Sequence, residues 1–183
     1  MKKVIKPGKK PQAEYRDWSP IYFNVVDSFI KVIDGKVYGF RISHIGSTSI
    51  EGCGGKGVID LLCEYEVGCF ERTIDVLLDI GFNYQGPEFA HPWPKHRPML
   101  LGNYRFREVD YLIYVHVVEM NKDEVRRFKD FQRILRGNKE KVLIYNKCKM
   151  EIIESGVVDT DEYARGKSKL IRELMGELHI VKS

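Results

Sequence analysis

A small polar turn and the aspartate that follows it are the residues of this chain best suited to chemistry. Four consecutive residues supply backbone amides and hydroxyl groups: Gly46, Ser47, Thr48 and Ser49. Glycine lets a backbone approach an anion closely and turn its N–H groups toward it. Asp60 interrupts the apolar run Val58–Cys63, where an unpaired carboxylate is costly unless it is hydrogen-bonded or binds a metal. The pattern predicts phosphates on the turn and a divalent cation between them and Asp60.

Two strands must flank this turn if the site is to form. Val37–Ile45 is rich in β-branched and aromatic residues and Val58–Cys63 is short and apolar, so the sequence predicts strand, turn, strand. Tyr111–Glu119 is the most strand-like run, and its alternation places His116 on the face opposite the odd-numbered apolar residues. Two interpretations of His116 stay open: a histidine satisfied within the sheet, or a ligand beside Asp60.

Helical periodicity predicts helices over most of the remaining chain. Apolar residues at helical spacing predict helices over Trp18–Asp34, Cys69–Ile80, Asp123–Leu135, Lys139–Ser155 and Thr160–Leu178. Further strands are expected at Phe82–Tyr84 and Met99–Phe106. Residues 85–98 are full of Gly, Pro and aromatics and are expected to form an irregular loop. That loop carries His91 and His96, to which the sequence assigns no role.

Length and composition favour one soluble domain. A chain of 183 residues can bury a substantial core, and we expect a flexible tail over residues 1–17 and a single domain over 18–183. No apolar run approaches the roughly 20 residues of a membrane span, so no membrane partner is expected. The four cysteines lack paired spacing and no secretory signal opens the chain, which favours reduced thiols and a cytoplasmic protein.

The motif around the turn resembles two known patterns. Gly46-Ser47, followed thirteen residues after the serine by Asp60, resembles the Gly-Ser motif of the nucleotidyltransferase superfamily, in which the acid on the next strand binds metal. His44-Ile-Gly-Ser-Thr-Ser-Ile and Lys56-Gly-Val-Ile-Asp60 together are similar to the GrpB family pattern H-[IV]-G-S-T-[AS]-V-P-G-L-x-x-K-P-I-I-D. Three positions depart from that pattern: Glu51, Cys53 and Gly57 stand at its proline, leucine and second proline.

The resemblance continues to the C-terminus. Val115–Glu119 is similar to the family strand H-L-H-V-V, with Tyr114 where the first histidine usually stands and His116 retained. Segments that begin at Phe128, Tyr145 and Tyr163 resemble the family patterns F-R-D-Y-L-R, Y-x-x-L-K and Y-x-x-x-K. The resemblance implies that basic residues face bound phosphates, with candidates Lys56, Arg133, Lys149 and Lys167, and His44 beside the turn. Solvated helix faces explain the charges on the C-terminal helices equally.

The fold that follows is α+β and nucleotidyltransferase-like, with a mixed, mostly antiparallel sheet of about four or five strands and packed helices. The implied function is metal-assisted transfer on a nucleotide or phosphorylated small molecule. Asp60 and His116 would hold Mg²⁺ or Mn²⁺, and Lys56 would stabilise developing charge. Leu62 stands where a second aspartate is usual, which favours a catalytically degenerate nucleotide sensor as the alternative. An RNA-binding accessory role is third, because no aromatic-basic RNA motif is present. The oligomeric state is not predicted.

Overall fold

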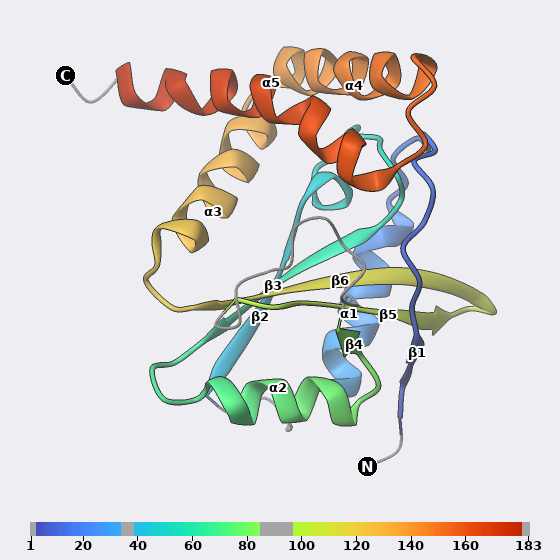
Figure 1. The fold of residues 1–183 in the computed structure, drawn as a ribbon, viewed down its shortest axis with the longest axis vertical. Coiled ribbons are helices and arrows are strands. Elements are labelled where there is room, and N and C mark those ends of the chain that lie inside the picture. The colour runs from blue at the N-terminus through green and yellow to red at the C-terminus, as the bar shows by residue number, and fades with distance from the viewer. Residues whose placement is uncertain (1–2, 34–38, 85–96, 181–183) are drawn as a thin grey trace.

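The chain is described by a computed structural model that covers residues 3–33, 39–84 and 97–180 (Figure 1). Its strands are β1 (Ile5–Pro7), β2 (Phe40–Ile45), β3 (Ile59–Tyr65), β4 (Asn83–Tyr84), β5 (Met99–Phe106) and β6 (Val109–Glu119). Its helices are α1 (Ile21–Ile33), the short 3₁₀ helix η1 (Ser47–Ser49), α2 (Phe70–Asp79), α3 (Asp123–Arg136), α4 (Lys139–Glu154) and α5 (Thr160–Ile180). His91 and His96 lie outside the described residues.

The strands form one mixed sheet in the order β1-β5-β6-β3-β2, with β4 also paired to β5. In the part of the chain that the structure describes, β3 and β6 pair in parallel and every other strand pair is antiparallel. The α+β prediction is confirmed. The expected four or five strands become six, because the N-terminal segment also joins the sheet.

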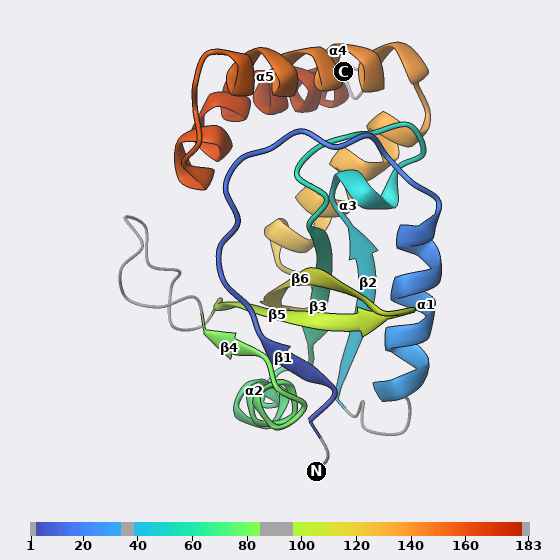
Figure 2. The same ribbon diagram turned by 90° about the vertical axis from the view of Figure 1, so that its right-hand side faces the viewer.

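The two faces of the sheet carry different helices. Alternate residues of β3 and β6, such as Leu61 and Val115, pack with α1 and α2 in the largest apolar cluster. The opposite face carries Leu62 and Val118, which pack against α3 through Val125. α4 and α5 lie side by side beyond one end of the sheet (Figures 1 and 2). The predicted alternation of residues 111–119 between two faces is confirmed by these clusters.

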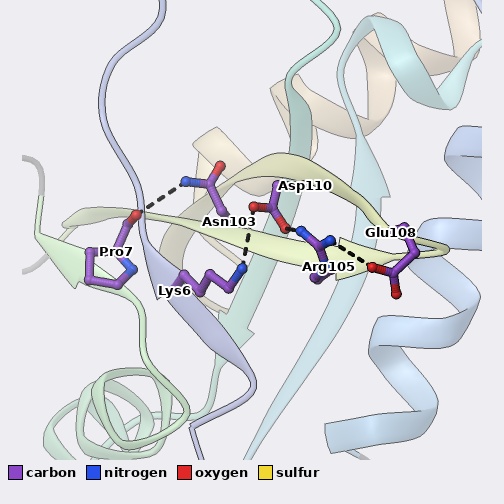
Figure 3. A network of polar contacts seen from close by, with 6 residues as sticks. All are labelled: Lys6, Pro7, Asn103, Arg105, Glu108 and Asp110. Atoms are coloured by element: carbon purple, nitrogen blue, oxygen red, sulfur yellow. Dashed lines mark hydrogen bonds and ion pairs between the residues drawn. The ribbon is translucent and has the colours of Figure 1, made fainter.

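The N-terminal segment departs from the sequence-based expectation of a flexible tail over residues 1–17. Strand β1 pairs antiparallel with β5, and Ile5 is buried. Figure 3 shows how polar contacts secure this edge: Asn103 donates to the Pro7 carbonyl (3.1 Å), and Lys6 pairs with Asp110 (3.4 Å). Two apolar residues, Val4 and Ile5, among lysines are a weak strand signal, and the segment becomes a strand because β5 supplies its partner.

The segment between β1 and α1 then runs along the molecule toward the start of α5 (Figure 2). Ala13 N–H donates to the Val158 carbonyl (2.9 Å), and the Thr160 hydroxyl donates to the Pro11 carbonyl (2.6 Å). Arg16 and Gly55 exchange two backbone hydrogen bonds of 2.7 and 2.9 Å. These hydrogen bonds hold residues 8–17 against the start of α5 and against the loop that joins η1 to β3.

Within the described residues, no helix is both long and apolar enough to cross a membrane.

Candidate functional site

The polar turn joins β2 to β3 and brings its first residue against the aspartate. Ile45 and Asp60 are register partners at the ends of β2 and β3, so Gly46 follows directly beside Asp60. Gly46 has φ 69°, and a Cβ placed on it would collide with the Asp60 carboxyl group. Both constraints require glycine. The local sequence thus places the turn and the carboxylate at the same end of the sheet.

Residues from distant segments hold the turn in shape. The Gln132 side chain donates to the His44 carbonyl (2.8 Å) and to the Ser49 hydroxyl (2.6 Å). Arg136 donates to the Ser49 carbonyl, at 2.9 Å from its closer nitrogen, and the Trp18 indole donates to the Thr48 carbonyl (3.1 Å). None of these three was a sequence-based candidate. Trp18 was noted only as a core residue, and the polar residues of α3 carry no local signal that distinguishes them.

The predicted phosphate-binding residues divide into two groups. Thr48 and Ser49 are buried, and their hydroxyl groups serve the turn: Thr48 Oγ1 lies 2.9 Å from His44 Nε2, and Ser49 Oγ donates to the Gly46 carbonyl (2.7 Å). Ser47 is only partly buried, and its Oγ accepts from Lys149 Nζ at 3.5 Å. Ser47 is therefore the hydroxyl of the turn that is available to a ligand.

His44 belongs to the structure of the turn. Burial lowers the pKa of His44 to about 4, although the nearby Asp60 carboxylate acts in the opposite direction. The imidazole ring therefore stays neutral near pH 7 and can form one hydrogen bond with the Thr48 hydroxyl group. The ring also packs against Phe23 in a T-shaped arrangement, with 5.8 Å between the ring centroids.

Asp60 and His116 lie together on the two parallel strands. His116 Nε2 is 3.3 Å from Asp60 Oδ1, and the two side chains are 13% and 29% exposed. In the ladder, Asp60 pairs with Tyr114 and Leu62 with His116, so all four share the face that α3 covers. Phe128 of α3 packs on the His116 ring at 5.1 Å between centroids. Phe128 therefore covers His116, while the Asp60 carboxylate stays partly exposed to solvent.

Three lysines approach the same end of the sheet from different elements. Lys149 on α4 is fully buried, and its ammonium group contacts Ser47 Oγ, the Cys53 sulfur (3.3 Å) and the Gly54 carbonyl. Lys56 precedes β3, and Lys167 lies on α5. Their ammonium groups lie 5.4 and 4.5 Å from the ring centroid of Tyr163, which packs with both.

The lysines carry positive charge in a poorly solvated place. Burial lowers the pKa of Lys56 to about 8 and, reinforced by the charges of Lys56 and Lys149, that of Lys167 to about 8. Burial also lowers the pKa of Lys149. Over residues 3–33, 39–84 and 97–180, none of the three forms an ion pair with a carboxylate. With pKa values of about 8, Lys56 and Lys167 remain largely protonated near pH 7, so the cluster has an excess of positive charge that an anion would neutralise.

These groups surround a pocket of about 390 Å³, counting the part that opens to solvent. Its wall comes from the segment before α1 (Arg16, Asp17, Trp18), the turn (Ser47), the glycine-rich loop (Gly54, Gly55, Lys56), β3 (Asp60) and α5 (Tyr163, Lys167). Segments that are far apart in the sequence therefore build one concave, cation-rich site whose lining includes the carboxylates of Asp17 and Asp60.

Arg133 is not brought into this site. Its side chain is 69% exposed and pairs with Asp130 one turn earlier on α3, at 2.9 Å. Arg133 is not among the residues that line the pocket, whereas Lys56 and Lys167 of the same predicted group line it and Lys149 contacts Ser47 beside it.

Asp60 and His116 fit one divalent cation. Two ligand atoms at right angles, each about 2.1 Å from one Mg²⁺, lie about 3 Å apart, close to the separation found here. In the described part of the chain, no group of three or more His, Cys, Asp or Glu side chains could hold a metal. A cation would therefore have two protein ligands and would need further oxygen ligands from a bound molecule and water.

Comparison with known proteins supports the sequence-based resemblance. The chain is 25% identical over 159 residues to "UPF0157 protein BH1888" of Halalkalibacterium halodurans, covering 86% of this chain and 76% of that protein. The crystal structure of the conserved protein GrpB from Enterococcus faecalis superposes with a TM-score of 0.66 at 21% identity, covering 90% of this chain and 96% of that one. That likeness shows that the two chains share a fold.

More remote likenesses add little. Cid1 poly(U) polymerase bound to MgGTP aligns with a TM-score of 0.49 at 11% identity, covering 71% of this chain and 42% of that one, and we draw no argument from it. The model of the GrpB protein family matches residues 13–177, which include every residue of the pocket described above. The chain belongs to the GrpB family.

Proposed function

We propose that the protein binds a nucleotide or a related phosphorylated small molecule in the pocket between the Gly46–Ser49 turn and α5. The observation that carries this proposal is the convergence of three lysines beside one pocket, Lys149 buried and Lys56 and Lys167 half-buried. None of them forms an ion pair with a carboxylate among the described residues, and burial lowers the pKa of each. Buried cations are expensive unless compensated. A phosphate group compensates several at once through charge-assisted hydrogen bonds.

Each residue has a role in this proposal. Ser47 Oγ, which accepts from Lys149 Nζ at 3.5 Å, donates to one phosphate group, and Lys149 adds its positive charge from behind. Lys56 and Lys167 both lie close to the ring of Tyr163 and neutralise the remaining charge of the phosphate group. Packing against that ring reduces the exposure of the two ammonium groups to water, which strengthens their attraction for an anion.

Asp60 and His116 would hold Mg²⁺ or Mn²⁺ that arrives with the phosphates. Such an ion neutralises phosphate charge and polarises a phosphoryl oxygen. It joins a site in which Lys56 already faces the Asp60 carboxylate, so the ion and the lysine compete for the same negative charge. We therefore expect the cation to bind with a phosphorylated ligand and only weakly without one.

Binding without turnover is the second candidate, and one residue favours it. Leu62 is fully buried against Ile45, Val118 and Val125, at the place where a second metal-binding carboxylate is expected in a two-metal transferase. A site with one carboxylate supports at most one well-held ion. Nucleotidyl transfer therefore requires more metal-binding groups than this site offers, whereas ligand sensing requires only binding.

A thermal-shift screen tests the proposal. Nucleoside mono-, di- and triphosphates and inorganic phosphate are titrated with and without Mg²⁺ or Mn²⁺. Binding raises Tm in proportion to the logarithm of ligand concentration over Kd. Unphosphorylated nucleosides serve as control ligands and are expected to have no effect. If no phosphorylated compound raises Tm more than its nucleoside does, the proposal fails.

Calorimetric titration of two variants tests the metal. Asp60→Asn preserves the shape of the side chain and is expected to abolish the contribution of Mg²⁺ to nucleotide affinity. His116→Ala is expected to weaken it. Unchanged metal and nucleotide affinity in Asp60→Asn would mean that this carboxylate is a structural partner, and the transferase form would fail with it. Incubation of the wild type with labelled nucleoside triphosphates and analysis for released pyrophosphate then separates transfer from sensing.

A further inference from the structure

Tyr114 presents a buried polar group that the described part of the protein leaves unsatisfied. The side chain is 5% exposed, and its hydroxyl group has no hydrogen-bond partner among the described residues. A buried phenol without a partner loses its hydration and gains nothing in return. Tyr104, on the neighbouring strand β5, shows the usual alternative: it is equally buried, and its hydroxyl group meets Ser28 Oγ at 2.9 Å.

The position of Tyr114 connects it to the pocket. It is the register partner of Asp60 on the adjacent parallel strand, and the two side chains share a face of the sheet. Lys56 Nζ lies 6.0 Å from the centroid of its ring and 5.4 Å from that of Tyr163. Lys56 therefore lies between two tyrosines, one of which lines the pocket while the other borders the Asp60 strand.

The chemistry of the group limits what it can recognise. A neutral phenol carries one O–H donor, and a tyrosine phenol has an ordinary pKa of about 10, so it acts as a hydrogen-bond donor at neutral pH. The rest of its surroundings are apolar: Val58, Met99 and Leu101 pack with it. A donor beside a lysine in an apolar wall is matched by an anionic oxygen.

From these observations we infer that the Tyr114 hydroxyl group donates a hydrogen bond to the phosphorylated molecule bound in the pocket, next to Lys56. This inference rests on the proposed function and adds a specificity-determining residue to it. Because Tyr114 pairs with Asp60 on the neighbouring strand, a phosphate oxygen that reaches both Lys56 and Tyr114 lies further across the sheet, toward β6, than one bound at Ser47. The ligand then extends from the turn toward β6.

The variant Tyr114→Phe tests this inference because it should not lower the stability of the free protein but should weaken phosphate binding. Removing an unsatisfied hydroxyl group is expected to leave Tm of the free protein unchanged or to raise it. The same change is expected to weaken the affinity for inorganic phosphate about tenfold, since a charge-assisted hydrogen bond is lost. Affinity is measured by calorimetry and Tm by thermal unfolding of the full chain.

Tyr104→Phe is the matched control. It removes the same atom from an equally buried ring whose hydroxyl group is satisfied, so it is expected to lower Tm and to leave phosphate affinity unchanged. The inference is overturned if Tyr114→Phe binds phosphate as tightly as the wild type, or if its affinity falls only in step with a lowered Tm. Absence of phosphate binding in the wild type is a different result, because it overturns the proposed function itself.

Discussion

Asp60 and Glu64 occupy the same face of β3, four residues apart, yet their surroundings are opposite. Glu64 is 1% exposed and accepts hydrogen bonds from Arg41 (2.8 Å) and Lys129 (2.9 Å). Burial acts to raise the pKa of Glu64, but these two cations outweigh it and lower the pKa overall. Asp60 is more exposed and has only His116 at hydrogen-bonding distance among the described residues, with Lys56 nearby.

The two sites differ in whether the cations around the carboxylate are compensated. At Glu64, one buried carboxylate is matched by two cations whose side chains remain half exposed, so water and the acid together satisfy them. This cluster ties β2, β3 and α3 together. At Asp60, one partly exposed acid faces three lysines, of which Lys149 is buried and the other two are half-buried, and it cannot neutralise all three. A carboxylate inside a strand therefore marks a structural clasp when the cations around it pair with it and remain solvated, and a candidate ligand site when they neither pair with it nor reach water.

The largest effect is expected from breaking the Glu64 clasp. The double variant Arg41→Ala/Lys129→Ala leaves a buried carboxylate without a counter-charge, which costs about 3–5 kcal/mol of stability. Urea unfolding followed by circular dichroism measures the loss. Arg126→Ala removes an exposed pair with Asp123 and is the control, with an expected change of less than about 1 kcal/mol. A double variant as stable as this control would contradict the clasp.

The opposite result is expected from removing a lysine of the pocket. Lys167→Met deletes a buried cation, so the free protein should become more stable, while phosphate affinity should fall about tenfold or more. Lys169→Met is the matched control, because Lys169 lies two residues away on α5 with 84% of its side chain exposed. Calorimetry and thermal unfolding report the two quantities. A loss of stability in Lys167→Met would show that the lysine is already satisfied by the protein.

The free energy of unfolding and the phosphate affinity should also change in opposite directions as the pH rises. Lys56 and Lys167 have folded-state pKa values of about 8, below the ordinary 10.5. Between about pH 8 and pH 10 the unfolded chain binds more protons than the folded one, so the free energy of unfolding of the free protein rises with pH from these groups. Phosphate affinity falls over the same range as the lysines lose their charge.

Titrations at about pH 7.5 and pH 9.5 are expected to differ in phosphate affinity by about tenfold. The double variant Lys56→Met/Lys167→Met should bind weakly and show little dependence on pH. Parallel urea unfolding at both values checks the stability slope. Phosphate affinity that stays constant in the wild type would exclude these lysines as the groups that contact the anion.

The smallest effect is expected from Arg133→Ala. Arg133 is exposed and pairs with Asp130, so its removal should change stability by less than about 1 kcal/mol and phosphate affinity by less than about twofold. Calorimetry under the conditions used for Lys167→Met makes the comparison direct. A loss of affinity comparable to that variant would place Arg133 in the site after all.

Local patterns predicted much of the fold. Helix and strand periodicity placed nearly every element, because periodicity depends only on which side of a helix or strand is buried. The hairpin between β5 and β6 was missed: Arg107 and Glu108 form its two-residue turn with φ 47° and 66°. Such turns ordinarily use Asn or Gly, so this pair gave no signal. The short strand β1 was missed because its partner lies about 100 residues away.

The sequence by itself determined the part of the site that is local. Gly46, Ser47 and Asp60 lie in one strand–turn–strand unit, where chain connectivity makes them neighbours, and the alternation of residues 111–119 put His116 and Tyr114 on one face. These positions follow from steric rules of turns and strands, which act over a few residues.

Tertiary structure alone decided which charges belong to the site. Arg133, Lys149 and Lys167 are all basic residues on C-terminal helices, and nothing in their local sequence separates them. Packing turns Lys149 and Lys167 inward, toward Ser47 and Tyr163, and leaves Arg133 in water beside Asp130. It also brings Gln132, Arg136 and Trp18 onto the turn from distant segments. Burial and charge balance depend on long-range contacts, which no local pattern encodes.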